Sequence, residues 1–133
     1  MKAVDQVIKQ KLHKPFKWGE NDCCLIAADL VSAMTGQDPA AAFRGTYDSE
    51  VGALKIIAKH GGSVETLLDS YLSEPKPINQ AKTGDIALLL NERGQQQACI
   101  VFRSVVYAPG ENGLVRKPLS QALKIWSIKS CHQ

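Results

Sequence analysis

A cysteine stands at the start of the most apolar segment of this 133-residue chain. Residues 23–34 are apolar nearly all round, which is typical of a buried helix. Asp22 is suited to cap the N-terminus of that helix, and Gly36 is suited to end it. Cys23 would then lie at the positive end of the helix macrodipole, which favours the thiolate, the form that attacks carbonyl carbons. The alternative is that Cys23 and Cys24 are small hydrophobic residues that fill a core.

A cysteine hydrolase also needs a base, and the chain has three histidines. His13 ends a first expected helix, His60 lies at the end of a later one, and His132 lies in the C-terminal tail. For each, the simpler interpretation is an exposed or capping residue. His13 is the best substitute base because it directly precedes the loop that carries Trp18. Trp18 itself either flanks a substrate groove or packs its loop against the core.

The other cysteines predict neither a disulfide framework nor a metal centre. The chain has four cysteines, but none of them forms a C-x-x-C pair. Cys131 and His132 are adjacent, but they lie in a tail that we expect to fray. Nothing marks the chain as secreted, so we do not expect disulfides. We therefore expect no metal and no other cofactor.

The composition is that of one ordinary globular domain over residues 1–133. Hydrophobic residues make up 44% and charged residues 22% of the chain, enough for a single core without disulfides. The net charge of +3 comes from scattered basic residues with no interleaved aromatics, which argues against nucleic-acid binding. The N-terminal segment lacks the apolar run of a signal peptide, and no segment reaches membrane-spanning length. We therefore expect synthesis in the cytoplasm and no membrane insertion.

Helical periodicity predicts four helices before residue 73. They cover residues 2–13, residues 22–35, a segment from Asp48 or Ser49 to Lys59, and about residues 63–72. Residues 73–83, with two prolines, are interpreted as a surface linker. The residues expected to face inward from the first and third helices are Val4, Val7, Ile8, Leu12, Val51, Leu54, Ile57 and Ala58.

After the linker, short apolar runs separated by turn residues indicate strands. They are expected at residues 85–90, 97–102, 105–108, 114–115 and 125–128. Helices followed by a strand meander indicate an α+β fold. In this fold the N-terminal helices pack on a C-terminal antiparallel sheet, and the helix at residues 22–35 is the central one.

This order of elements, with a cysteine opening the core helix, resembles the NlpC-type cell-wall peptidases, a papain-like superfamily. Their opening motif, aromatic-x-Trp-Gly and then Asp-Cys-Ser-Gly-Leu, corresponds to residues 16–25, with a compressed gap and one small residue missing. Their Pro-Gly-Asp strand corresponds to residues 83–88, and their His-Val-Gly-Ile-Tyr strand corresponds to residues 97–101. Their third strand, an aromatic or aliphatic pair before a polar residue and Ala, corresponds to residues 105–109.

More narrowly, the chain is similar to a domain of unknown function encoded by tailed phages and prophages. Four motifs in order mark that branch: Trp-Gly-x-x-Asp-Cys, Thr-Gly-x-Asp-Pro, Arg-Gly-x-Tyr and a Gly-Gly helix end. They are found at residues 18–23, 35–39, 44–47 and 61–62. For Arg44 and Tyr47, the functional interpretation is a docking surface or cleft wall. The alternative is that Arg44 hydrogen-bonds loop carbonyls and pins its loop over the core helix.

The resemblance implies a nucleophile at Cys23, a base position at Gln97 and an orienting position at Tyr107. Trp18 would be a tentative substrate-binding residue. Glutamine cannot take the proton of a thiol, so the implied site lacks its base. Either the site is inactive, or another group, such as His13 or His60, reaches the thiol.

The resemblance therefore implies a phage tail-tip or tail-assembly component on an inactive peptidase-like fold. Its partners would be other tail-tip or hub proteins, in the virion tail or in the bacterial cytoplasm before assembly. The alternative is an active cysteine amidase or peptidase that cleaves peptidoglycan peptides during DNA entry. A third class, a regulatory or toxin-related binding module carried by a prophage, has no specific support from the residues.

Overall fold

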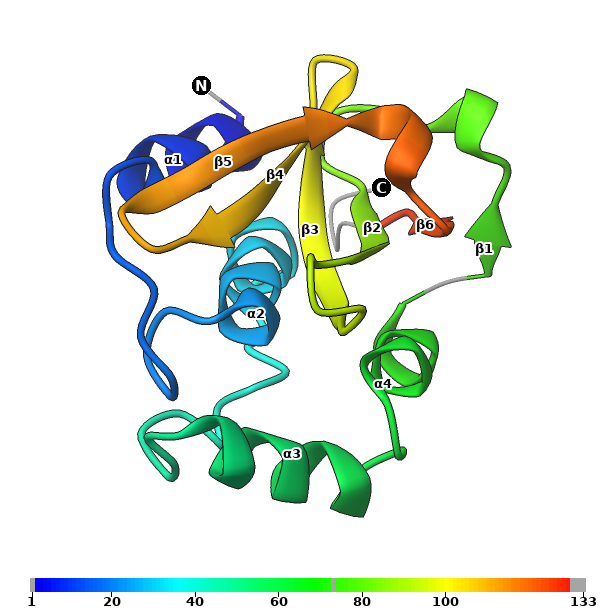
Figure 1. Cartoon of the computed structure of the whole chain (residues 1–133). Coiled ribbons are helices and arrows are strands. Elements are labelled where there is room, and N and C mark those ends of the chain that lie inside the picture. Colours follow the sequence, from blue (N-terminus) through cyan, green and yellow to red (C-terminus); the bar gives the residue numbers. More distant parts are fainter. Residues whose placement is uncertain (1, 73, 130–133) are drawn as a thin grey trace.

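A computed structural model, which describes residues 2–72 and 74–129, has helices in its first half and a sheet in its second (Figure 1). The described helices are α1 (Ala3–Lys11), α2 (Cys23–Thr35), α3 (Glu50–Lys59) and α4 (Val64–Tyr71). The strands are β1 (Pro75–Lys76), β2 (Ile86–Leu90), β3 (Gln96–Phe102), β4 (Val105–Gly110), β5 (Gly113–Pro118) and β6 (Lys124–Trp126). The α+β class predicted from the sequence is confirmed.

The six strands form one sheet in the order β1-β6-β2-β3-β4-β5, and every described pairing is antiparallel. The expected strands are all present, with bounds that differ by a few residues. The expected linker contains a strand that the sequence analysis missed, because Pro75 and Lys76 pair with Trp126 and Ile125 at one edge of the sheet. An edge position suits a proline, which has no N–H to donate.

Helix α2 is the central helix, as predicted. The Asp22 side chain accepts a hydrogen bond from the Leu25 N–H at 3.0 Å, and Gly36 ends the helix in the left-handed region at a φ of 81°. Its inner face packs on one side of the sheet, beside β3 in Figure 1. The buried residues that join α2 to the sheet are Ile26, Ala27, Leu30, Ile86, Leu88, Ala98 and Ile100.

A second core lies on the opposite face of the sheet. It contains alternate residues of the same strands, among them Leu89, Cys99 and Val101. Leu119, from the 3₁₀ turn that connects β5 to β6, packs against it. The central part of the sheet is therefore covered on both faces, and β2, β3, β4 and β6 have one side toward α2 and one side toward this second core.

The predicted inward face of α3 is wrong for three of its four residues. Ala53 is buried and Ile57 packs partly against the core, but Val51 is 62% exposed and Leu54 is 53% exposed. Ala58 is also exposed. Figure 1 places α3 apart from the sheet, so the helix can bury only a narrow stripe.

In α1, Val4, Val7 and Ile8 are buried as predicted. Leu12 lies beyond the end of the helix and is 37% exposed, against the prediction. The helix ends at Lys11, one residue before Leu12.

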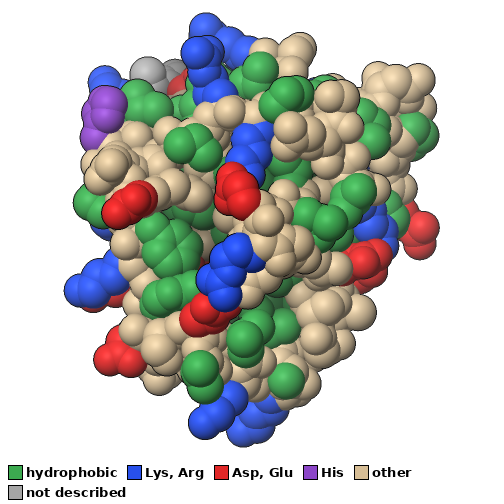
Figure 2. All heavy atoms as spheres, viewed as in Figure 1, with side chains coloured by type: hydrophobic (Ala, Val, Ile, Leu, Met, Phe, Trp, Pro, Cys, Tyr) green, Lys and Arg blue, Asp and Glu red, His purple; other side chains and the backbone are tan. Residues whose placement is uncertain are grey.

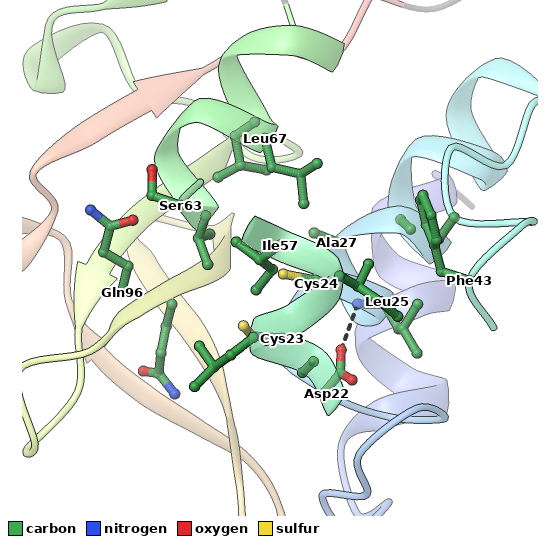
Figure 3. A pocket seen from close by; sticks show the side chains of 18 of the residues that line it. Asp22, Cys23, Cys24, Leu25, Ala27, Phe43, Ile57, Ser63, Leu67 and Gln96 are labelled. Carbon is green, nitrogen blue, oxygen red and sulfur yellow. Dashed lines mark hydrogen bonds between the residues drawn. The ribbon is translucent and has the colours of Figure 1, made fainter. Parts of the chain in front are cut away.

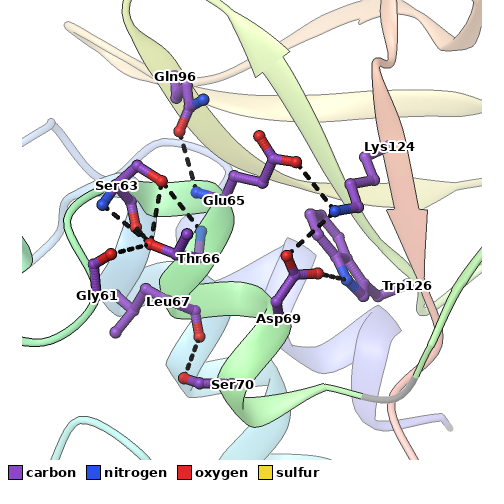
Figure 4. A network of polar contacts seen from close by, with 10 residues as sticks. All are labelled: Gly61, Ser63, Glu65, Thr66, Leu67, Asp69, Ser70, Gln96, Lys124 and Trp126. Carbon is purple, nitrogen blue, oxygen red and sulfur yellow. Dashed lines mark hydrogen bonds and ion pairs between the residues drawn. The ribbon is translucent and has the colours of Figure 1, made fainter.

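Helix α4 is held to the sheet by a polar network (Figure 4). Lys124 donates to Glu65 at 2.9 Å and to Asp69 at 3.1 Å, and Asp69 also accepts the indole N–H of Trp126 at 3.0 Å. At the start of the helix, the Glu65 N–H donates to the side chain of Gln96 at 3.0 Å. These contacts hold α4 against β3 and β6.

Candidate functional site

An apolar groove with a cavity volume of about 470 Å³ lies between α2, α3, α4 and the start of β3. Figure 3 shows Cys23 and Cys24 on the first turn of α2, with Leu67 of α4 across from them and Gln96 at the side. Hydrophobic side chains make up most of the wall. They include Val31, Phe43, Leu54, Ile57, Leu67, Leu68, Tyr71 and Leu72.

Hydrogen bonds to the sulfur of Cys23 favour its thiolate. A hydrogen bond from the Cys24 thiol lowers the pKa of Cys23, and N–H donation from Ala98 and Cys24 acts in the same direction. Burial and the negative charge of Asp22 oppose this shift without reversing it. The pKa of Cys24 is raised well above its usual value, because its thiol hydrogen is held by Cys23 and because it is buried. Cys23 is therefore the member of the pair that ionises first.

Asp22 serves as a structural cap rather than as a catalytic acid. Its Oδ1 accepts the Leu25 N–H, and its Oδ2 accepts the Gly19 N–H at 3.0 Å and the Tyr47 hydroxyl at 2.5 Å. Burial and this bond to Asp22 raise the pKa of Tyr47. One carboxylate thus joins the Trp-Gly loop, the N-terminus of α2 and the Tyr47 segment.

The glycine of the Trp-Gly motif is required by close packing. Gly19 has a φ of 81°, and a Cβ there would come within 1.9 Å of the Tyr47 carbonyl oxygen. The Gly19 carbonyl also accepts the N–H of Gly45 at 3.1 Å. The residues before the thiol and the Arg-Gly-x-Tyr motif are therefore in direct contact.

Arg44 pins its loop over α2, but through carboxylates rather than the expected loop carbonyls. Its guanidinium lies 2.7 Å from Asp38 and 2.7 Å from Asp29 of α2. Arg44 lowers the pKa of Asp38, and Asp29 also pairs with Lys11 at 2.6 Å. Direct contacts thus join the Trp-Gly, Asp-Pro and Arg-Gly-x-Tyr motifs to one another and to α2.

Gln97 and Cys23 both line the groove, but the register of β3 turns Ala98 toward α2. Gln97 lies opposite Leu89, which belongs to the second core, whereas Ala98 belongs to the core that contains α2. Oε1 of Gln97 is buried and has no hydrogen-bond partner among the described residues. The β3 residues that line the groove are Gln96 and Gln97, and a glutamine side chain cannot act as a base.

Tyr107 lies away from the groove-lining residues. It pairs with Ile100, three residues along β3 from Gln97, and packs against the core on the α2 side. Its ring centroid is 5.9 Å from that of Phe102 in an edge-on arrangement. The structure therefore brings Cys23 and Gln97 to one groove but keeps Tyr107 as a packing residue.

Trp18 lines the groove together with Phe16. Their ring centroids are 4.8 Å apart and nearly perpendicular, which is a favourable aromatic geometry. Both side chains are partly buried, so each keeps some surface toward solvent. Trp18 is thus placed where the tentative binding role would require it, while also packing its own loop.

Neither described histidine lines the groove. His13 lies beside Gly113 at the start of β5, and His60 caps the end of α3 and contacts the Phe43 ring at 4.7 Å. His132, with Cys131, lies outside the described residues. Within residues 2–72 and 74–129, no cluster of His, Cys, Asp and Glu is suited to hold a metal ion, and no helix is long and apolar enough to cross a membrane.

One polar contact at the groove rim was missed by the sequence analysis. The side chain of Gln95 donates to Glu50 at 2.6 Å, and Arg93 lies 3.6 Å from the same carboxylate. This contact ties the start of α3 to the β2–β3 turn. The partners are 45 positions apart in the sequence, so no local signal pointed to it.

The sequence was compared with models of known protein families. Residues 1–128 match the model of a family described as a domain of unknown function, DUF6950. No curated protein matches the chain.

Proposed function

Because the chain belongs to the DUF6950 family, a domain of unknown function, we propose its function from the site and its motifs. We infer a non-catalytic component of a phage tail tip or tail assembly, built on a fold of the NlpC type. The phage-type motif set at residues 18–62 supports the setting. Its partners would be neighbouring tail-tip or hub proteins.

The observation that carries the non-catalytic assignment is the surroundings of Cys23. Hydrolysis of an amide needs a base for the thiol and for water, and an acid for the leaving amine. The described residues that line the groove include no histidine, and the β3 residues among them are Gln96 and Gln97, which cannot act as bases. Asp22 is committed to three hydrogen bonds. The groove therefore supplies a nucleophile, Cys23, but no described side chain that could serve as the base or the acid of the reaction.

A second candidate, an active cysteine amidase or peptidase acting on peptidoglycan, is favoured by one observation. The pKa of Cys23 is lowered, chiefly by a hydrogen bond from the Cys24 thiol. The Cys23 thiolate is thus favoured for attack on an amide carbonyl, even though hydrolysis of the resulting acyl-enzyme lacks a base. This candidate requires a base from outside the described residues or from a partner.

Replacement of Cys23 separates the two candidates. In a phage that carries the gene, Cys23→Ala should leave particle assembly and infectivity unchanged, because the thiol has no hydrolytic role. Purified wild-type protein should release no fragments from peptidoglycan stem peptides. Cys99→Ala, which removes a buried thiol from the second core and not from the groove, serves as the matched control. Particles that assemble with Cys23→Ala but lose infectivity, while Cys99→Ala particles keep it, would establish the enzyme instead.

The tail setting has its own test. Antibody or mass-spectrometric detection should find the protein in purified tails at a fixed ratio to the hub proteins. A protein recovered only from the soluble lysate of infected cells would contradict the setting.

A further inference from the structure

The wall of the groove contains few charged side chains, and each already has hydrogen-bond or ion-pair partners within the protein. The charged residues that line it are Asp22, Glu50 and Arg93. Asp22 caps α2, while Glu50 is bound to Gln95 and lies beside Arg93. The body of the groove between α2, α3 and α4 is lined by hydrophobic side chains. The polar lining residues of the groove include Asn91, Gln95, Gln96 and Gln97, from the β2–β3 turn and the start of β3. An occupant of the hydrophobic body must itself be apolar, because an unpaired polar group is costly to bury.

The size of the groove selects among apolar occupants. A helix about 10 Å across with a pitch of 5.4 Å would fill about 470 Å³ with roughly one turn. One turn is too short for a stable helix to dock. An extended peptide would bury backbone N–H and C=O groups against hydrophobic walls. A linear aliphatic chain has neither problem, and at about 30 Å³ for each water-sized group the volume holds about fifteen methylenes.

The cysteine stands in the wall of this same groove. Cys23 is partly buried and lines the groove together with Cys24. We propose that the groove holds a long fatty acyl chain bound as a thioester to Cys23, delivered by an acyl thioester such as a coenzyme A ester.

The reaction is a transthioesterification between two sulfurs. The Cys23 thiolate attacks the acyl carbonyl carbon of the donor, and the new S–C bond forms as the donor S–C bond breaks. The donor sulfur leaves as a thiolate and takes a proton from water. No general acid is needed, because a thiolate is a good leaving group, and no oxidant or reductant takes part.

The absence of a base among the described groove residues argues against peptide hydrolysis, and it also favours a stable thioester on Cys23. Release of the acyl group would need activated water, and no described groove residue is placed to activate it. The thioester should therefore persist as a modification rather than turn over. This inference depends on the groove and Cys23 alone and does not require the tail setting.

The test is acylation of the purified full chain, followed by intact-mass spectrometry. Palmitoyl coenzyme A, below its micelle concentration, should add one acyl group that hydroxylamine removes, and Cys23→Ala should remain unmodified. Each methylene buried in the groove is worth about fourfold. Palmitoyl coenzyme A should therefore react at least about a hundredfold faster than acetyl coenzyme A at equal concentration.

Two variants of α3 separate chain recognition from simple thiol reactivity. Leu54 lines the groove, whereas Val51 on the same helix is exposed and does not. Leu54→Asp should slow palmitoylation at least about tenfold and leave acetylation unchanged, and Val51→Asp should change neither rate. Circular dichroism verifies that both variants are folded.

Three results would overturn the proposal. They are equal rates for palmitoyl and acetyl donors, an adduct that survives in Cys23→Ala, and palmitate bound without a covalent adduct. Rapid release of the acyl group as free acid would also contradict the stable thioester, and it would point to the enzyme candidate.

Discussion

Helices α3 and α4 form two walls of the same groove but are attached to the protein in different ways. Helix α4 buries Val64 and Leu68 and is bound to β6 through Asp69 and Glu65. Helix α3 buries only Ala53 among its residues, and its polar tie to the sheet lies at one end, through Glu50. The groove therefore has one wall fixed to the sheet and one wall attached mainly by its first residue.

This difference determines how the groove can admit a ligand. Figure 2 shows hydrophobic side chains at the surface in the lower part of the view, where Figure 1 places α3, with Lys and Arg at the lower edge. A helix with little buried apolar area opens at low free-energy cost. We infer that the groove opens by displacement of α3, while α2 and α4 keep the thiol in place.

The largest expected effect is a difference in the free energy of unfolding between two variants, each with one leucine of a groove wall replaced by alanine. Leu68→Ala should lower the free energy of unfolding by about 2–5 kcal/mol, because Leu68 is only 8% exposed in the core. Leu54→Ala should change it by about 0.5 kcal/mol or less, because Leu54 is 53% exposed. Urea unfolding followed by circular dichroism measures both values. Equal losses would show that α3 is as firmly packed as α4.

A smaller effect is expected from the polar ties of the two helices. Asp69→Ala should cost about 1–3 kcal/mol, because it leaves the indole N–H of the fully buried Trp126 without its acceptor. Glu50→Ala should cost less than about 1 kcal/mol, because it frees only groups at the groove rim. It should instead increase hydrogen exchange in α3 while leaving α4 unchanged. Faster exchange in both helices would mean that they move as one unit.

The smallest effect concerns the thiol between the walls. Cys24→Ala removes the hydrogen bond that lowers the pKa of Cys23, so that pKa should rise. The thiolate fraction, and with it the rate of alkylation by iodoacetamide, increases as pH rises through the pKa. The midpoint of the rate profile should therefore move to higher pH in Cys24→Ala, and Cys24→Ser, which keeps a donor, should move less. An unchanged midpoint in Cys24→Ala would exclude the Cys24 bond as the cause.

Local signals made α2 predictable in full. Its apolar run, its cap at Asp22 and its stop at Gly36 act within a few residues of one another, and the structure has all three. The strands were predictable for the same reason, since each is a short apolar run between turn residues. The edge strand at Pro75–Lys76 was missed because two residues carry no periodicity, and only pairing with Trp126 and Ile125 defines it.

Features that depend on relative placement were not predictable. The apolar residues of α3 fit an inward face, but the sequence does not state that the helix lies away from the sheet, so Val51 and Leu54 were misplaced. Similarly, the sequence did not show which face of the sheet each β3 residue takes: Gln97 lies opposite Leu89 of the second core, and Ala98 belongs to the core that contains α2. The assignment of Gln97 to the base position stays a prediction. A shift of one residue in a strand exchanges its faces. The groove itself has no sequence signal.

The bond between Asp22 and Tyr47 also has a consequence for how the chain reaches this structure. It joins positions that are 25 residues apart, and closing a flexible loop of that length costs about 3 kcal/mol of chain entropy. No single hydrogen bond returns that amount. The cost is met only when Gly19, Asp22 and Tyr47 come together with the ion pairs of Arg44. The corner that holds the thiol therefore forms as one cooperative unit, and partial assembly of its motifs has no free-energy advantage.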